Sequence, residues 1–248
     1  PQSIKIAGGT PVLAKDKNFT ASLENIQEKI TKKTKIIFLA NPNNPTGTMV
    51  CEEEIKSFFD DIRSDILVVL DSAYAEYVDN KDYTDGSKFV EEFDNIIMLR
   101  TFSKLHALAS LRLGWAYCPI KVANILKSIR PAFSVNALAS FAGIAAVEDI
   151  KFKELSLAHN KKYKEWVFKK LETHQIDFIP SETNFFLLNF KSEELASDAL
   201  EFLEKNNIFV RGMRPYNLNS YLRITIGEEN EMEKLLDCLL EFLGNAKK

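Results

Sequence analysis

The sequence predicts an α/β fold with two domains. The large domain has a mostly parallel sheet with helices on both faces, and a smaller α/β domain follows toward the C-terminus. In the first half, short apolar runs recur about every 30 residues, the length of one strand–helix–strand unit. In the second half, a long helical pattern precedes short strands that alternate with amphipathic helices. We expect the large domain over residues 1–147 and the small domain over 148–248.

The strands of the large domain are expected where apolar runs are continuous rather than alternating. These runs are 35–40, 66–70 and 95–100, and a continuous run is typical of a parallel strand buried on both faces. Between the first two runs, residues 51–63 have apolar side chains at helical spacing and acidic residues in the first turn. Acidic side chains favour the N-terminus of a helix, so this segment predicts a crossover helix.

The second half changes in character from about residue 134. We expect an Ala-rich helix over 134–147 and a longer, Lys-rich helix over 150–173. Short strands and amphipathic helices then alternate in the small domain: strands over 184–190, 208–211 and 221–226, and helices over 192–206 and 228–243.

Composition excludes several classes of protein. The 248 residues have a formal net charge of −3, which argues against a nucleic-acid-binding protein, because such a protein needs a strongly basic face. The longest apolar runs fall far short of the roughly 20 residues of a membrane-spanning helix, so we expect no membrane partner. The three cysteines and three histidines lack disulfide or metal-ligand spacing. We therefore expect no metal site and a reducing, cytoplasmic location.

Polar clusters directly follow the three apolar runs. They are residues 41–47 (Asn-Pro-Asn-Asn-Pro-Thr-Gly), residues 71–74 (Asp-Ser-Ala-Tyr) and residues 101–104 (Thr-Phe-Ser-Lys), with Arg112 shortly after the last. Ligands bind beyond the carboxyl ends of parallel strands. If the strands are neighbours, the three clusters lie around one cleft.

The chemistry of these clusters matches one cofactor. A lysine amine can form a Schiff base with an aldehyde, and hydroxyls with an arginine can bind a phosphate. A carboxylate can keep a pyridine nitrogen protonated, while an amide and a phenol can bond a ring hydroxyl. Taken singly, each cluster has a structural explanation as a turn, a helix cap or a surface lysine. Their joint order at the strand ends favours pyridoxal 5'-phosphate (PLP).

With these motifs, the chain resembles the class I/II aminotransferases of PLP fold type I, and the histidinol-phosphate aminotransferases in particular. The resemblance runs over essentially all 248 residues. It includes Arg112-x-Gly114 and, in the second half, residues 180–186, 210–211 and 222–227. The motifs are specific for fold and cofactor and much less specific for substrate.

The resemblance implies roles for the cofactor-binding residues. Lys104 would hold the cofactor covalently and, once freed, would act as the catalytic base that moves a proton. Asp71 would pair with the pyridinium nitrogen, and Asn44 and Tyr74 would bond the ring hydroxyl. Three side chains would bind the cofactor phosphate: Thr101, Ser103 and Arg112.

The substrate residues implied by the resemblance lie in the small domain. Arg223 would bind the anionic group of the substrate, with Arg211 as a second contact and Asn184 in the neighbouring loop. Two structural alternatives stay open, namely an ion pair of Arg223 with Glu228 and a turn role for Asn184. His106 stands where the family often has an aromatic residue, and we expect it to be structural.

The implied function is transfer of an amino group between an amino acid or amino-alcohol phosphate, such as histidinol phosphate, and a 2-oxo acid. This reaction places the chain in histidine biosynthesis, with small molecules as partners. The alternatives are a PLP-dependent decarboxylase or lyase of the same fold, and a PLP-binding module with little activity.

The resemblance also carries expectations about assembly. Its members are homodimers whose active sites borrow residues across the interface, so we expect a homodimer. They also have an N-terminal portion before the segment that begins at Lys5, which contributes cofactor contacts and a tyrosine for the neighbouring subunit. The sequence starts at Pro1 without a counterpart to it. We therefore expect these 248 residues alone to bind PLP weakly.

Overall fold

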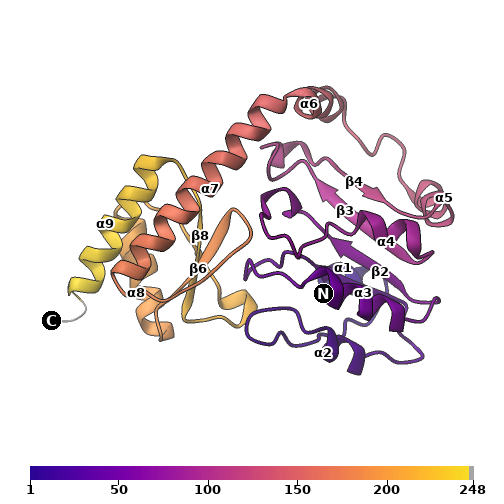
Figure 1. The fold of residues 1–248 in the computed structure, drawn as a ribbon, viewed down its shortest axis with the longest axis horizontal. Helices are drawn as coiled ribbons and strands as arrows, with labels where there is room; N and C mark the ends of the chain where they lie inside the picture. Colours follow the sequence, from indigo (N-terminus) through magenta and orange to yellow (C-terminus); the bar gives the residue numbers. More distant parts are fainter. Residues whose placement is uncertain (246–248) are drawn as a thin grey trace.

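The computed structural model describes residues 1–245 and contains two separate sheets, each with its own apolar core. A long helix, α7 (Ile150–Thr173), runs from the large domain to the small domain and packs on the core of the latter (Figure 1). None of the helices within the described residues is long and apolar enough to cross a membrane.

The large sheet contains four strands in the order β1-β2-β3-β4. Strands β1 (Ile36–Ala40), β2 (Leu67–Asp71) and β3 (Ile96–Thr101) are parallel neighbours, as the three apolar runs predict. β4 (Gly114–Tyr117) pairs with β3 in the antiparallel direction. The sheet is therefore mostly parallel, with an antiparallel strand added at one edge.

The helices of the large domain are mostly short. They are α1 (Gln2–Ile6), α2 (Leu23–Glu28), α3 (Glu52–Asp61), η1 (Ala75–Tyr77), α4 (Ser87–Glu92), η2 (Ala109–Leu111), α5 (Ile120–Ile129) and α6 (Ala137–Glu148). The first turn of α3 holds three glutamates, and the Glu54 carboxylate accepts a hydrogen bond from the Cys51 backbone N–H at 3.1 Å. These contacts satisfy the free amide end of the helix.

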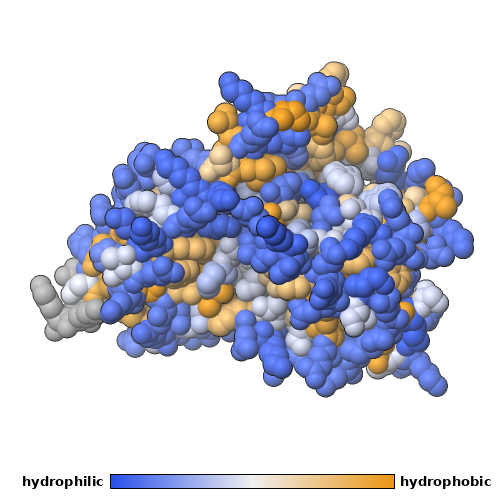
Figure 2. Space-filling model, viewed as in Figure 1, coloured by the Kyte–Doolittle hydropathy of each residue, from blue (hydrophilic) through white to orange (hydrophobic). Residues whose placement is uncertain are grey.

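The two faces of the large sheet differ in how they are covered. On one face, α2, α3 and α4 pack over a core that includes Ile37, Val68 and Ile96. On the other face, the central strands are buried, whereas Ile36 and Phe38 of the edge strand β1 are exposed. Exposed apolar residues also gather over α5 and α6 (Figure 2).

The small domain has an antiparallel sheet in the order β5-β6-β8-β7. Its elements after α7 are β5 (Phe178–Ile179), β6 (Phe185–Asn189), α8 (Glu193–Lys205), β7 (Arg211–Gly212), η3 (Arg214–Tyr216), β8 (Tyr221–Thr225) and α9 (Glu229–Asn245). The strand expected over 208–211 is wrong in its bounds. Ile208 and Val210 pack against the core without joining the ladder, which starts only at Arg211.

Candidate active site

The carboxyl ends of β1, β2 and β3 bring the three polar clusters together. Ala40 lies opposite Asp71, and Asp71 lies opposite Leu99 in the parallel ladder. Residues 41–47, 71–74 and 101–104 therefore leave the sheet side by side. The convergence expected from the sequence is confirmed.

Hydrogen bonds to buried groups hold the loop over 41–47 in place. The buried Asn41 side chain donates to the Val50 carbonyl at 3.1 Å and accepts from the Val50 N–H at 2.8 Å. The Glu182 N–H of the small domain donates to the Gly47 carbonyl at 2.8 Å. This loop of the large domain thus contacts the small domain, and Asn44 lies where the two domains meet.

Asp71 ends strand β2 with its carboxylate facing solvent at the strand end. Its Oδ1 accepts a hydrogen bond from the Ala73 N–H at 3.2 Å. Protein on its other sides raises the pKa of this carboxyl by desolvation, and the Ala73 N–H and the charge of Lys104 lower that pKa by less. A nearby positive charge, such as a pyridinium, would lower this pKa again.

An aromatic and cationic stack connects the two domains at this edge. The Lys104 amine lies 5.0 Å from the centre of the Tyr74 ring, and Tyr74 is only 4 % exposed. Tyr74 meets Phe185 of β6 edge to face, with ring centres 5.2 Å apart. The Arg223 guanidinium lies 4.7 Å from the centre of Phe185. Lys104 and Arg223 are thus linked through successive contacts with the rings of Tyr74 and Phe185.

The residues expected to bind a phosphate come together through the β3–β4 pairing. Thr101 lies opposite Gly114, and the Phe102 N–H donates to the Leu113 carbonyl at 3.1 Å, which brings Arg112 beside this segment. The Thr101 hydroxyl accepts from the Ser103 N–H at 3.0 Å. Arg112 is exposed, and its guanidinium donates to the Ala109 carbonyl at 2.8 Å. Two hydroxyls and one cation therefore share a corner without a carboxylate bonded to any of them in the described chain.

Arg223 lies on β8 directly opposite Arg211 of β7. Burial lowers the pKa of Arg223, and the charge of Arg211 lowers it further. The Arg223 Nη1 donates to the Asn44 Oδ1 at 2.5 Å, and its buried Nε has no partner among residues 1–245. The alternative ion pair with Glu228 is not formed between these two described residues, and the Arg223 guanidinium donates to Asn44 instead.

Two further residues singled out in the sequence, Asn184 and His106, make structural contacts. The carbonyl of Asn184 accepts from the Ile226 N–H at 2.9 Å, so its backbone closes the end of the β6–β8 ladder. The His106 ring packs on Phe102 with centres 4.9 Å apart, and burial lowers the pKa of this histidine.

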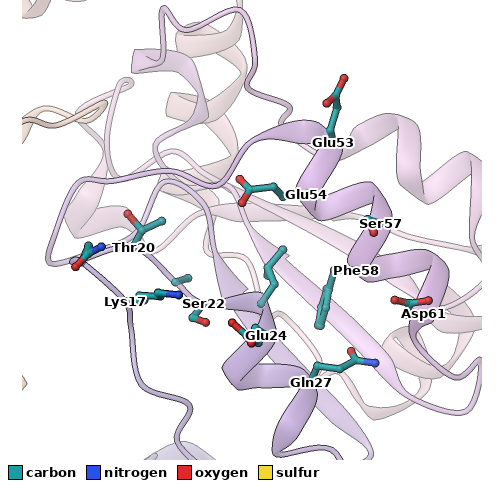
Figure 3. A pocket seen from close by; sticks show the side chains of 13 residues that line it. Lys17, Thr20, Ser22, Glu24, Gln27, Glu53, Glu54, Ser57, Phe58 and Asp61 are labelled. Atoms are coloured by element: carbon teal, nitrogen blue, oxygen red, sulfur yellow. The ribbon is translucent and has the colours of Figure 1, made fainter.

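Sequence reasoning missed Phe185, which separates Tyr74 from Arg223. It lies in a fully apolar strand, where the residue types alone do not distinguish it from core. The described residues also form two large hollows, neither of which is lined by residues 41–47, 71–74 or 101–104. One, of about 790 Å³, lies between α2, α3 and the preceding loop and is lined by side chains such as Gln27, Ser57 and Phe58 (Figure 3). The other, of about 860 Å³, lies between α7 and the segment over 76–80.

Comparison with known proteins identifies the class of this chain. Residues 1–239 match the model of the family "aminotransferase class I and II". The chain belongs to this family, whose members are PLP-dependent aminotransferases.

Individual relatives and solved structures agree with this assignment. The chain is 43 % identical over 242 residues to a histidinol-phosphate aminotransferase of Paramagnetospirillum magneticum, covering 97 % of this chain and 67 % of that protein. It is 40 % identical over 244 residues to the enzyme of the same name from Rhodospirillum centenum, covering 98 % and 67 %. The histidinol-phosphate aminotransferase of Sinorhizobium meliloti, solved with PLP, superposes with a TM-score of 0.90 at 25 % identity, covering 99 % and 67 %. The chain thus spans about two thirds of the length of these proteins.

The residues at the strand ends fit PLP, the cofactor of this family. The Lys104 amine lies over the Tyr74 ring, and the Asp71 carboxyl has a raised pKa that a pyridinium would lower. The corner of hydroxyls and arginine offers donors to a phosphate. When bound, PLP supplies an electron sink for the substrate carbon.

Proposed function

We propose that this chain provides the machinery for amino-group transfer between histidinol phosphate and a 2-oxo acid. The observation that carries this proposal is the pair of arginines, Arg211 and Arg223, opposite each other on neighbouring strands. Like charges in directly opposite positions destabilise a sheet. A substrate phosphate between them would remove that repulsion, and guanidinium groups bind phosphate through paired hydrogen bonds.

The relatives support the choice of an amino-alcohol phosphate. Those at about 40 % identity bear the name histidinol-phosphate aminotransferase. A 2-oxo acid, which carries a carboxylate in place of the phosphate, suits the same two arginines in the second half of the reaction.

In this proposal each cofactor residue has one task. Lys104 holds the cofactor and moves the proton at the substrate carbon. Asp71 keeps the ring nitrogen protonated, and Thr101, Ser103 and Arg112 bind the phosphate. Because Arg223 occupies the Asn44 Oδ1, the Asn44 amide NH₂ remains as a donor to the ring oxygen, alongside the Tyr74 hydroxyl.

The reaction is tested by incubating the PLP-loaded chain with histidinol phosphate and 2-oxoglutarate and measuring the glutamate formed. We expect Arg223→Lys to raise the KM for histidinol phosphate about tenfold, because lysine cannot reproduce the forked contact. The visible absorption of bound PLP should stay unchanged in this variant. In Lys104→Ala, glutamate formation should be lost.

Arg214→Lys is the matched control, because Arg214 lies in the same domain but pairs with Glu193 at 3.0 Å on the surface. Its KM should equal that of the parent chain. An unchanged KM in Arg223→Lys would show that Arg223 does not bind the substrate. Carbon dioxide released from an O-phosphorylated amino acid, without glutamate formation, would favour the decarboxylase alternative.

The homodimer remains part of this proposal. The exposed apolar residues on α5 and α6 support it, because a large contiguous apolar surface usually marks an interface.

A further inference from the structure

Arg100 is a charged residue at the end of an otherwise apolar strand, directly before Thr101. Its side chain is only 15 % exposed. The Nη2 atom lies 2.8 Å from the Glu76 Oε1, and the Nη1 atom lies 2.9 Å from the Asp85 Oδ2. The guanidinium also lies over the Trp115 ring, 6.0 Å from its centre.

Stability alone does not account for this arrangement. Desolvating an arginine and its carboxylates costs about as much as their attraction returns, and apolar replacements are often as stable. The Arg100 Nε is moreover buried without a partner among residues 1–245. What the two ion pairs of Arg100 do determine is the position of the chain segment that contains Glu76 and Asp85.

Both carboxylates belong to the segment that carries Asp71 and Tyr74. Glu76 lies in η1, which begins just after Tyr74, and the Tyr77 N–H donates to the Tyr74 carbonyl at 3.0 Å. At the other end, the Asp85 carbonyl accepts from the Ser72 hydroxyl at 2.8 Å, and Ser72 directly follows Asp71. Arg100 thus holds the segment over 71–85 at two points, at Glu76 just after Tyr74 and at Asp85, whose backbone bonds Ser72.

We propose that Arg100 is a positioning residue that fixes the Asp71 carboxylate and the Tyr74 phenol relative to Lys104. Arg100 lies on β3, the strand that leads into residues 101–104, so one side chain ties the two cofactor-binding segments together. This inference rests on the roles proposed above for Asp71 and Tyr74. It requires the planar fork of arginine, because a lysine ammonium cannot hold two carboxylates in the same fixed geometry.

The test uses the full chain and measures PLP itself rather than turnover alone. In Arg100→Lys and Glu76→Gln we expect PLP affinity to fall about tenfold, the effect of one charge-assisted hydrogen bond. We also expect a shift in the pH at which the visible absorption of bound PLP changes, since Asp71 and Tyr74 set the charge on the ring.

Arg63→Met is the matched control, because Arg63 pairs with Asp65 at 2.8 Å on the surface, away from these segments. It should leave both PLP readouts unchanged. Arg100→Met removes the charge altogether. If Arg100→Met does not fold, Arg100→Lys and Glu76→Gln alone test the proposal. Parental PLP affinity and absorption in the folded Arg100 and Glu76 variants, with only a lower melting temperature, would overturn the proposal. Both readouts are independent of the substrate, so an inactive chain on histidinol phosphate would refute the proposed reaction without touching this inference.

Discussion

In the proposed site, Asp71 would serve the cofactor as an ionised carboxylate, whereas its surroundings raise the pKa of this carboxyl. Burial raises its pKa in the folded chain without cofactor. A carboxyl with a higher pKa in the folded than in the unfolded state stabilises the protein below both values, and this contribution is lost as the pH rises through the folded pKa. We expect Asp71→Asn to melt at a higher temperature than the parent chain without PLP at about pH 8, and this difference to shrink toward about pH 4. Its transaminase activity should fall about 10²–10³-fold.

Asp65→Asn is a control of opposite sign. Hydrogen bonds from Arg63 and Lys35 lower the pKa of Asp65 to about 2. Its contribution to stability is therefore present above the unfolded pKa and is lost as the pH falls, so Asp65→Asn should melt lower than the parent chain at neutral pH. A lower melting temperature of Asp71→Asn at about pH 8 would contradict the account given for Asp71.

At the level of single residues, the sequence predicts side chains that directly follow a strand. Asp71 and Lys104 are recognisable for this reason, because the ends of parallel strands share one edge. Arg100 and Arg223 are each a charged residue within an apolar strand, and this pattern makes both recognisable in the sequence. Its partners Glu76 and Asp85 could not be chosen beforehand, because only the path of the loop brings them to β3.

At the level of elements, the loop over 41–47 packs on the small domain through Gly47. Gly47 has a φ of +77°, and a Cβ there would lie 2.6 Å from the Ser181 Cβ. We expect Gly47→Ala to lower the free energy of unfolding by about 2–4 kcal/mol, from the left-handed backbone and the clash combined. Because the loop also carries Asn44, PLP affinity should fall in parallel. Urea denaturation and a PLP titration measure the two effects.

Gly8→Ala separates the cost of the left-handed backbone from the cost of the clash. Gly8 has a φ of +80° but no atom within 4 Å of a Cβ, so only the backbone term applies. We expect it to lose at most about 1–2 kcal/mol and to keep its PLP affinity. Equal losses in the two variants would show that the contact with Ser181 does not matter.

The elements themselves were predictable in proportion to their length and pattern. The three parallel strands and the long helices are confirmed, because each has an uninterrupted apolar or helical pattern. β4 was not expected, since Gly-Trp-Ala-Tyr over 114–117 is short and all four residues are exposed. The strand over 208–211 was misplaced because Ile208 and Val210 are apolar for packing on the core, while the ladder partners are determined by β8.

At the scale of the whole molecule, α6 is apolar on nearly all sides yet lies on the surface. Only Ala139 and Gly143 are buried along it, whereas Phe141 is 77 % exposed. Gly143 lets the helix approach Leu113, because a Cβ there would lie 2.5 Å from that side chain. The buried side of α6 therefore packs on the hairpin that carries Arg112, and the opposite side of the helix is exposed. A helix that is apolar all round is normally buried, so we expect a second copy of the chain to cover it.

Sedimentation velocity over a range of concentrations tests this assembly. We expect the parent chain to sediment with twice the mass of 28.2 kDa. In Phe141→Asp the dissociation constant should rise tenfold or more, roughly the effect of removing a central apolar contact. Phe209→Asp is the control, because Phe209 is 80 % exposed but lies between α8 and β7 in the small domain. Figure 1 shows α8 far from α6. The association of this variant should match that of the parent chain. A parent chain that sediments as a monomer throughout, or equal weakening by both substitutions, would exclude α6 as the interface. Loss of association only in Phe141→Asp would place the partner next to the β3–β4 hairpin with Arg112, which we propose binds the cofactor phosphate.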